Sequence, residues 1–249
     1  MVVFHSDLDN TLIYSYKRDI GDRKKRVEIY EGREISFMTD ISYALLKEIK
    51  KNVIFVPTTS RTIEQYNRID LGIGVPEYAL ACNGGVLLVN GVEDEKWYQE
   101  SLELVSDCQK EMQLAQALLE QDTYRTMEVR NIKNLFLFTK SKEPVQSVEK
   151  LSEALNLSLV DVFYNGVKVY VVPKNLNKGM AVKRFRQRKQ ADKVIAAGDS
   201  EFDISMLKEA DIAFAPKSLT EMAFIREDVI CPDDGEIFSD ALLNRIKKM

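Results

Sequence analysis

Short apolar runs alternate with helical patterns in the first and last parts of the chain. Residues 2–4, 52–57 and 193–197 are apolar runs that predict buried strands. Residues 39–50 carry apolar side chains at helical spacing, behind Thr39 or Asp40 as the N-cap. Strands that alternate with helices in this way predict a parallel sheet with helices on both faces. We therefore expect a doubly wound, Rossmann-like α/β core.

The pattern changes between about residues 88 and 168. The helices and strands expected there lie at residues 102–119, 134–139, 145–155, 157–164 and 167–172. Asn165 and Gly166 separate the last two strands and are a strong signal for a tight hairpin. An antiparallel sheet with two helices on one face forms a compact α+β module. We predict a discontinuous core of residues 1–87 and 169–249, interrupted by a cap domain at residues 88–168.

Two carboxylates, Asp7 and Asp9, stand at the end of the first apolar run. Ligands of open parallel sheets bind beyond the carboxyl ends of the strands, so these acids are expected to face the active-site crevice. One carboxylate could attack a phosphorus atom while the other moves a proton. An Asx-rich turn after a strand is the structural alternative.

Three further polar segments follow strands or begin helices. Residues 58–61, Thr-Thr-Ser-Arg, offer hydroxyls and backbone donors for a phosphate oxygen, or else form a helix N-cap. Lys178 precedes a helical run, where its ammonium could neutralise a phosphate and a carboxylate; a surface lysine is the alternative. Residues 198–203, Gly-Asp-Ser-Glu-Phe-Asp, supply further carboxylates for a hard cation.

In this order the segments resemble the four motifs of the haloacid dehalogenase superfamily of phosphatases and phosphotransferases. Those motifs are D-x-D-x-T, a Thr or Ser, a Lys, and G-D-x-x-x-D. Residues 81–85, Ala-Cys-Asn-Gly-Gly, resemble the S-N-G-A/G stretch of sugar-phosphatase-like members. The gap between Thr59 and Lys178 leaves room for a cap of the second type, as in the Cof-type, sucrose-phosphatase and phosphomannomutase-like branches.

The resemblance implies a set of acids around Mg²⁺. Asp7 would be the nucleophile and a metal ligand, and Asp9 the general acid/base, with its backbone carbonyl on the metal. Asp199 would be a further ligand. Asp203 would bind the metal directly or through water. Phe202 occupies the place of an asparagine in the sugar-phosphatase form of the last motif, which leaves the role of Glu201 open.

The resemblance also implies how the phosphate is held. Thr59 would hydrogen-bond the transferring phosphoryl group, and Lys178 would offset its charge and orient Asp7. Thr59 is preferred to Thr58 because it aligns with the family's T-G-R pattern, and the choice could be wrong by one residue. The expected substrate contacts are Thr59, Ser60, Arg61, Asn83 and Lys178.

A charged segment at residues 14–33 follows the acid pair, and its alternation over residues 26–30 predicts a short β-hairpin flap over the site. Basic runs lie at residues 17–26 and 183–189. Such runs are usually solvated surface, although the first could help receive an anionic substrate. The formal net charge of −4 argues against nucleic acid as the main partner.

The 249 residues, 45% of them hydrophobic, are enough for a core and a smaller module. Cys82, Cys108 and Cys231 show no C-x-x-C spacing, which argues against a zinc site or a disulfide framework. We find no signal-peptide pattern and no apolar stretch near the roughly twenty residues of a membrane span. We expect a cytoplasmic monomer or homodimer. His5 is the single histidine and is expected to pack or hydrogen-bond beside the first strand.

These inferences predict a Mg²⁺-dependent phosphatase that hydrolyses a small phosphorylated metabolite, such as a sugar phosphate, through an aspartyl-phosphate. A phosphotransferase or mutase of the phosphomannomutase-like type is one alternative, and a catalytically weak binding or regulatory module is another. The sequence does not name the substrate, because leaving-group recognition is spread over cap loops without a motif.

Overall fold

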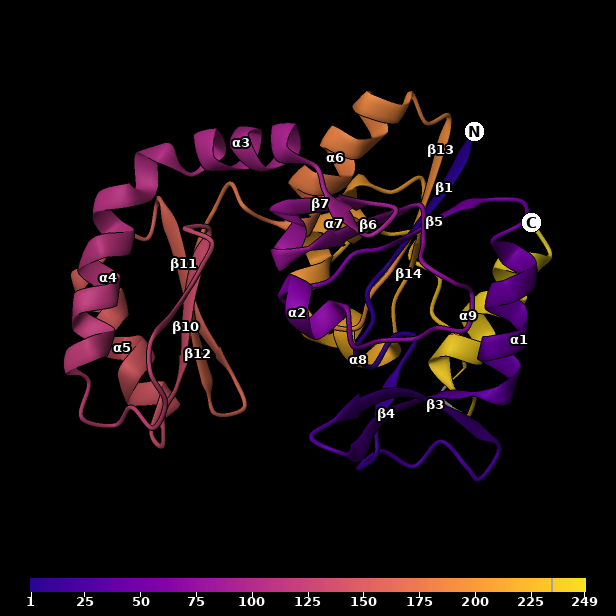
Figure 1. The fold of residues 1–249 in the computed structure, drawn as a ribbon, viewed down its shortest axis with the longest axis horizontal. Helices are drawn as coiled ribbons and strands as arrows, with labels where there is room; N and C mark the ends of the chain where they lie inside the picture. The colour runs from indigo at the N-terminus through magenta and orange to yellow at the C-terminus, as the bar shows by residue number, and fades with distance from the viewer. Residues whose placement is uncertain (234) are drawn as a thin grey trace. The chain divides into compact units, whose positions relative to one another are not determined.

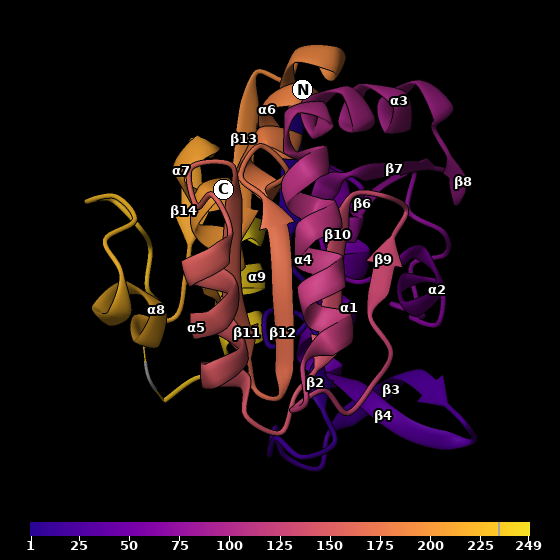
Figure 2. The same cartoon turned by 90° about the vertical axis from the view of Figure 1, so that its left-hand side faces the viewer.

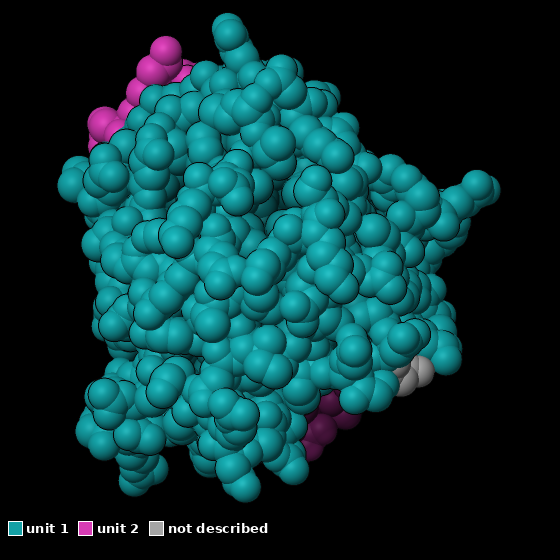
Figure 3. Space-filling view, turned by 90° about the vertical axis from the view of Figure 1, so that its right-hand side faces the viewer, with its two compact units in different colours: residues 1–94, 178–249 teal, residues 95–177 magenta. Residues whose placement is uncertain are grey.

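A computed structural model describes residues 1–233 and 235–249 of the chain. The chain divides into two compact units, which Figure 1 shows as a ribbon and Figure 3 distinguishes by colour. The core unit consists of Met1–Asp94 and Lys178–Met249, and the inserted unit of Glu95–Asn177. Among the described residues, no helix combines the length and apolar character that a membrane crossing requires.

The core unit is built on a parallel sheet with the strand order β14-β13-β1-β5. Its strands are β1 (Val2–Ser6), β5 (Ile54–Pro57), β13 (Lys193–Ala197) and β14 (Ile212–Phe214). Ser6 pairs with both Pro57 and Ala197, so the three central strands end at the same level. The residues that follow these strands therefore meet at one edge of the sheet.

A smaller antiparallel sheet extends the parallel one. It consists of β6 (Tyr78–Ala81), β7 (Val86–Val89) and β8 (Val92–Glu93), and a bridge between Thr58 and Leu80 joins it to the segment after β5. A short 3-10 helix, η1 (Cys82–Gly84), connects β6 to β7.

Helices cover both faces of the parallel sheet. α1 (Asp40–Ile49) and α9 (Phe238–Lys247) pack together on one face, and α6 (Lys178–Lys189) and α7 (Ile204–Glu209) pack together on the other (Figure 1). The remaining helices of this unit are α2 (Ile63–Tyr66), η3 (Glu201–Asp203) and α8 (Lys217–Met222). The amide of Ser42 donates to the Thr39 hydroxyl at 2.9 Å, so Thr39 is the N-cap of α1. The doubly wound α/β core is confirmed.

A three-stranded antiparallel sheet that contains a β-hairpin follows β1, in the region where a flap is predicted. Its strands are β2 (Tyr14–Ser15), β3 (Lys24–Tyr30) and β4 (Arg33–Thr39), in the order β2-β4-β3. The register shifts on both sides of Glu28, so β3 contains a bulge there.

The inserted unit is an antiparallel sheet with helices on one face. Its strands are β9 (Arg130–Ile132), β10 (Phe136–Lys140), β11 (Val160–Asn165) and β12 (Lys168–Pro173), in the order β11-β12-β10-β9. Figures 1 and 2 show α4 (Gln109–Gln121) and α5 (Pro144–Ala154) on the same face of this sheet. Leu119, Leu137, Leu151 and Val171 belong to the hydrophobic core between them. This is the α+β architecture predicted from the sequence.

Some boundaries differ from the sequence prediction. The units separate at 94/95 and 177/178 rather than at 87/88 and 168/169, because the β7–β8 hairpin pairs within the core unit and β12 continues to Pro173. The helix expected at residues 102–119 is divided into α3 (Glu95–Leu104), η2 (Ser106–Cys108) and α4. The Ser106 hydroxyl donates to the Glu103 carbonyl, a local bond that competes with a continuous helix. The turn expected at residues 233–235 includes residue 234, which lies outside the described residues.

Candidate active site

Asp7 lies at the end of the central strand β1, where its amide donates to the Ala197 carbonyl at 2.9 Å. The chain then turns tightly, because the amides of Leu12 and Ile13 both donate to the Leu8 carbonyl. Asn10 adopts a left-handed conformation with φ of +56° in this turn. The turn is held by hydrogen bonds of its own, so the position of Asp7 is fixed by both the strand and the loop.

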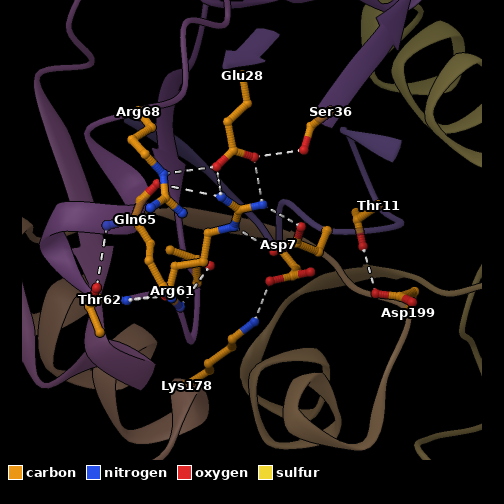
Figure 4. Close-up of polar contacts among 12 residues, drawn as sticks. Asp7, Thr11, Glu28, Ser36, Arg61, Thr62, Gln65, Arg68, Lys178 and Asp199 are labelled. Carbon is orange, nitrogen blue, oxygen red and sulfur yellow. Dashed lines mark hydrogen bonds and ion pairs between the residues drawn. The ribbon is translucent and has the colours of Figure 1, made fainter. Parts of the chain in front are cut away.

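Lys178 is a buried residue at the start of α6. Its ammonium donates to Oδ1 of Asp7 and to Oδ1 of Asp203, both at 2.6 Å. Figure 4 shows the bond to Asp7. Burial alone would lower the pKa of Lys178, but the two carboxylates outweigh it and the pKa is raised. The surface-lysine alternative is therefore wrong: with an exposed side-chain fraction of 1%, Lys178 is a fixed charge beside Asp7.

Two glycines let these segments approach each other. A Cβ on Gly179 would lie 2.4 Å from the backbone oxygen of Ser205, so α6 begins directly against α7. A Cβ on Gly198 would lie 2.2 Å from the Cβ of Asp203. Gly198, the glycine of the G-D-x-x-x-D segment, is thus required because a larger residue would collide with Asp203 at the end of the same segment.

Three acids gather where β1 and β13 end. Carboxylate oxygens of Asp7, Asp199 and Asp203 all lie within 4.8 Å of one another. Burial, followed by the neighbouring Asp203, raises the pKa of Asp199 to about 7. Burial also raises the pKa of Asp7 well above its usual range, although Lys178 opposes the shift. The three carboxyl groups therefore outnumber the single ammonium of Lys178. This set of oxygen ligands fits a hard divalent cation.

Asp203 differs from the other two acids because its carboxylate is already engaged. Oδ1 accepts from Lys178, and Oδ2 accepts from the amides of Asp199 and Ser200 and from the Ser200 hydroxyl. The acid therefore organises the loop and Lys178. Phe202, which replaces the asparagine of the sugar-phosphatase form, lies in η3 immediately before it.

The two neighbouring threonines after β5 have different surroundings. The Thr58 hydroxyl donates to the Val56 carbonyl at 3.1 Å and lies 3.0 Å from Nδ1 of His5. The Thr59 hydroxyl accepts from the amide of Arg61 at 3.1 Å. The Thr58 hydroxyl is thus bonded within the core unit, beside the buried His5. The Thr59 hydroxyl is instead bonded to the backbone amide of Arg61.

Asn83 lies in η1 with φ of +58°, and its backbone N–H donates to the Thr59 carbonyl at 3.0 Å. The amide of Cys82 donates to the Arg61 carbonyl at 2.8 Å. The two segments predicted to contact substrate, residues 59–61 and residues 82–83, are therefore tied together by backbone hydrogen bonds. Ser60 is half-buried within the first of them.

Asp9 and Arg61 form a two-bond ion pair. Nε of Arg61 donates to Oδ2 of Asp9 and Nη2 donates to Oδ1, both at 2.7 Å. The Asp9 side chain is 51% exposed and is not part of the three-acid cluster. Its carboxylate therefore lies outside the three-acid cluster, and the expected division between the side chain and the backbone carbonyl of Asp9 stays a prediction.

Arg61 uses all of its N–H groups within the protein. Besides the two bonds to Asp9, its Nη1 and Nη2 donate to Glu28 at 2.8 and 3.0 Å, and Nη1 also donates to the Gln65 carbonyl at 3.4 Å. A guanidinium has five N–H donors, so none remains for a ligand in this arrangement. The direct substrate contact expected of Arg61 stays a prediction, which would require some of these bonds to be exchanged.

Glu28 and Arg68 belong to this network, although the sequence did not indicate either of them (Figure 4). The alternation over residues 26–30 places Glu28 on the face opposite Val27 and Ile29. The bulge in β3 instead buries Val27 and Glu28 together and leaves Ile29 45% exposed. Period-two alternation does not reveal a bulge, so this acid could not be assigned to the site from the sequence.

The chain is similar to known hydrolases and phosphatases. A family model for haloacid dehalogenase-like hydrolases matches residues 86–235. A phosphoglycolate phosphatase from Methanopyrus kandleri is 26% identical over 198 residues, which cover 77% of this chain and 82% of that protein. A second phosphoglycolate phosphatase, from Sulfurisphaera tokodaii, is 30% identical over 159 residues, covering 61% of this chain and 62% of that protein.

Among solved structures, the sucrose-phosphatase from Synechocystis sp. PCC6803, in complex with sucrose and phosphate, superposes with a TM-score of 0.66. The match is 17% identical in sequence and covers 99% of this chain and 97% of that one, so it shows the shared fold. The family model covers more than half of the chain, and the four motifs occur in the order that the family requires. The chain belongs to the haloacid dehalogenase-like hydrolases.

Proposed function

We propose that this protein is a Mg²⁺-dependent phosphatase that hydrolyses a small phosphorylated metabolite through an aspartyl-phosphate on Asp7. The observation that carries the proposal is the placement of Asp7 at the end of β1. There it accepts a 2.6 Å hydrogen bond from the buried Lys178 and lies within the three-acid cluster. Phosphoryl transfer needs a nucleophile surrounded by positive charge, because a phosphate monoester dianion repels a carboxylate.

Asp7 and Asp199 are the residues proposed to hold the cation. Their carboxylates lie close together, and burial, with the neighbouring Asp203, raises the pKa of both acids although Lys178 opposes the shift. Asp203 would act through Lys178 and through water, because its oxygens already have protein donors. A bound Mg²⁺ would supply charge neutralisation for the phosphate and for the developing transition state.

Asp9 is the proposed acid/base. As acid, it would protonate the oxygen of the leaving alcohol while the oxygen of Asp7 forms a bond to phosphorus. As base, it would then take a proton from the water that cleaves the aspartyl-phosphate. Asp9 follows the proposed nucleophile Asp7 by two residues in the same turn. Its side chain is 51% exposed and therefore open to substrate and water.

Thr59 and Lys178 are proposed to contact the transferring phosphoryl group, together with Ser60 and Asn83. Thr59 is favoured over Thr58 because the Thr58 hydroxyl is already bonded to Val56 and His5. Lys178 would both orient Asp7 and offset the charge of the phosphate. A fixed ammonium of this kind stabilises the transition state without moving during the reaction.

The inserted unit is proposed to act as the cap that selects the leaving group. Phosphoglycolate and sucrose phosphate are suggested by the names of the relatives, and both are phosphate esters of small hydroxylated molecules. We therefore propose a small phosphorylated metabolite, with sugar phosphates as the first class to test. We also propose that the protein acts in the cytoplasm, as a monomer or homodimer.

A panel assay tests the proposal. Phosphate release from 2-phosphoglycolate, sugar phosphates and p-nitrophenyl phosphate would be measured with and without Mg²⁺, beside an Asp7→Asn control. We expect Mg²⁺-dependent turnover that the substitution removes. Adding hexose or polyol acceptors would detect the alternative phosphotransferase, whose rate would rise with acceptor and saturate.

A further inference from the structure

Glu28 is a buried acid that belongs to none of the four motifs. Its side chain is completely buried, and its two oxygens accept hydrogen bonds from Arg61, Arg68 and Ser36. Burial would raise the pKa of Glu28, but the hydrogen bonds from Arg61 and Ser36 outweigh it and the pKa is lowered. A buried carboxylate with this many donors is a fixed negative charge.

The bulge in β3 places Glu28 there. A regular strand would direct Val27 and Glu28 to opposite faces, whereas both are buried here. The bulged segment is also attached to the loop after α2, through a bridge between Glu28 and Ile69 and a hydrogen bond from the Asp70 amide to the Val27 carbonyl. Bulges that redirect a side chain in this way are frequent beside active sites.

Arg61 lies between Glu28 and Asp9 and donates hydrogen bonds to both acids. Figure 4 shows its bonds to Glu28. Nε and Nη2 face Asp9, while Nη1 and Nη2 face Glu28. The planar guanidinium can satisfy both carboxylates at once because its N–H groups form a rigid fork. Without Glu28, the Asp9 carboxylate would be the remaining acid on Arg61, and rotation of the guanidinium would move Asp9 with it.

We propose that Glu28 is a positioning residue for the acid/base: it fixes the guanidinium of Arg61, which in turn holds the carboxylate of Asp9 toward the leaving group. The inference rests on the proposed function, in which Asp9 delivers the proton. It assigns the β3 bulge of the hairpin a part in the reaction. It also explains why the N–H groups of Arg61 donate to Asp9 and Glu28 rather than to solvent.

The leaving group provides the first test. An alkoxide needs protonation as it departs, whereas p-nitrophenolate leaves without help, and kcat/KM reports the step in which the leaving group departs. For Glu28→Gln we expect kcat/KM to fall about tenfold with an alkyl phosphate and less than about twofold with p-nitrophenyl phosphate, a fraction of the full general-acid contribution. Asp9→Asn should show the same selectivity with a larger loss.

Arg68→Gln is the matched control. Arg68 also donates to Glu28, at 3.2 Å, whereas the two hydrogen bonds to Asp9 come from Arg61. Its loss should therefore leave the ratio of the two kcat/KM values unchanged. A double-mutant cycle with Arg61→Lys tests the route of the effect. If Glu28 acts through Arg61, adding Glu28→Gln to Arg61→Lys should lower kcat/KM for the alkyl phosphate less than twofold further.

A measurement without turnover keeps this proposal separate from the proposed function. In an NMR spectrum of the arginine Nε–H groups, the Arg61 signal, assigned through Arg61→Lys, should be slow to exchange and should broaden or exchange faster in Glu28→Gln. An unchanged signal would overturn the proposal, whatever the enzyme's activity. So would equal losses of kcat/KM with both substrates, or a leaving-group effect of the same size in Arg68→Gln.

Discussion

The ammonium of Lys178 lies 2.6 Å from Oδ1 of Asp7 and is buried with it, although the two residues are 171 positions apart in the chain. The parallel sheet makes this possible, because β1 ends where α6 begins to cover it. The pair gives the site one fixed positive charge against three acids. Four predictions follow from this arrangement and its surroundings.

Removing the ammonium should destabilise the fold as well as stop the reaction. Lys178→Met leaves Asp7 and Asp203 buried without their partner, which should lower the free energy of unfolding by about 3 kcal/mol, as for other broken buried pairs. Urea denaturation at neutral pH measures it. Lys183→Met, an exposed position on the same helix, should change the free energy of unfolding by less than about 0.5 kcal/mol. Equal effects of the two substitutions would contradict the role of Lys178.

Mg²⁺ should stabilise the protein through Asp199. At a hundred times its dissociation constant a ligand adds about 2.7 kcal/mol, so thermal denaturation should shift upward with Mg²⁺. Asp199→Asn should remove most of that shift. Glu201→Gln, at an exposed position in the same loop, should keep it. Loss of the shift in Glu201→Gln would instead make Glu201 a ligand.

Substitution of Thr58 should mainly affect stability, whereas substitution of Thr59 should mainly affect activity. Thr58→Val deprives His5 of its Nδ1 partner and should lower the free energy of unfolding by about 1–2 kcal/mol while changing kcat little. Thr59→Val should lower kcat/KM at least about tenfold, because a donor to the phosphoryl group is lost. The opposite pattern, with the larger loss of activity in Thr58→Val, would mean that the phosphate contact is one residue earlier.

His5 should make the protein sensitive to moderate acid. Burial lowers the pKa of His5 to about 3, whereas an unfolded chain has a histidine pKa near 6.5. Between about pH 3 and pH 6.5 the unfolded state therefore binds one more proton at His5 than the folded state. The free energy of unfolding falls as the pH drops below 6.5. The loss from this one group should reach about 2 kcal/mol between pH 8 and pH 5.

The comparison uses His5→Phe, which keeps a ring beside Phe185, whose centroid lies 5.3 Å from that of the His5 ring. Because the chain contains one histidine, the difference in unfolding free energy between the two proteins should change with pH over this window. A difference that stays constant from pH 8 to pH 5 would show that His5 is not buried in its neutral form.

The sequence predicted the parts of the site that follow from strand ends. Asp7, Lys178, Asp199 and Asp203 stand directly after or before elements with clear apolar patterns, and a parallel sheet brings such positions to one edge. Asp9 was also placed correctly in the turn after β1. The α/β class and the inserted α+β unit are confirmed by the observed sheets, and the family is confirmed by the family model.

What the sequence did not reveal depends on tertiary contacts. Glu28 enters the network through a bulge, and Arg61 is occupied by two acids that are 33 and 52 residues away from it. The break before α4 contains a local side-chain hydrogen bond from Ser106 to the Glu103 carbonyl. None of these contacts leaves a period in the sequence, so the sequence predicts one continuous helix and does not reveal the ion pairs of Arg61.

The most direct test of the account is the covalent step on Asp7. Rapid acid quench of the enzyme with Mg²⁺ and a labelled phosphate ester, followed by peptide mass spectrometry, should find one phosphoryl group on the peptide that contains Asp7. The label should disappear on a chase with unlabelled substrate and be absent from Asp7→Asn. Turnover that persists in Asp7→Asn, or a phosphoryl group on another residue, would contradict the central claim.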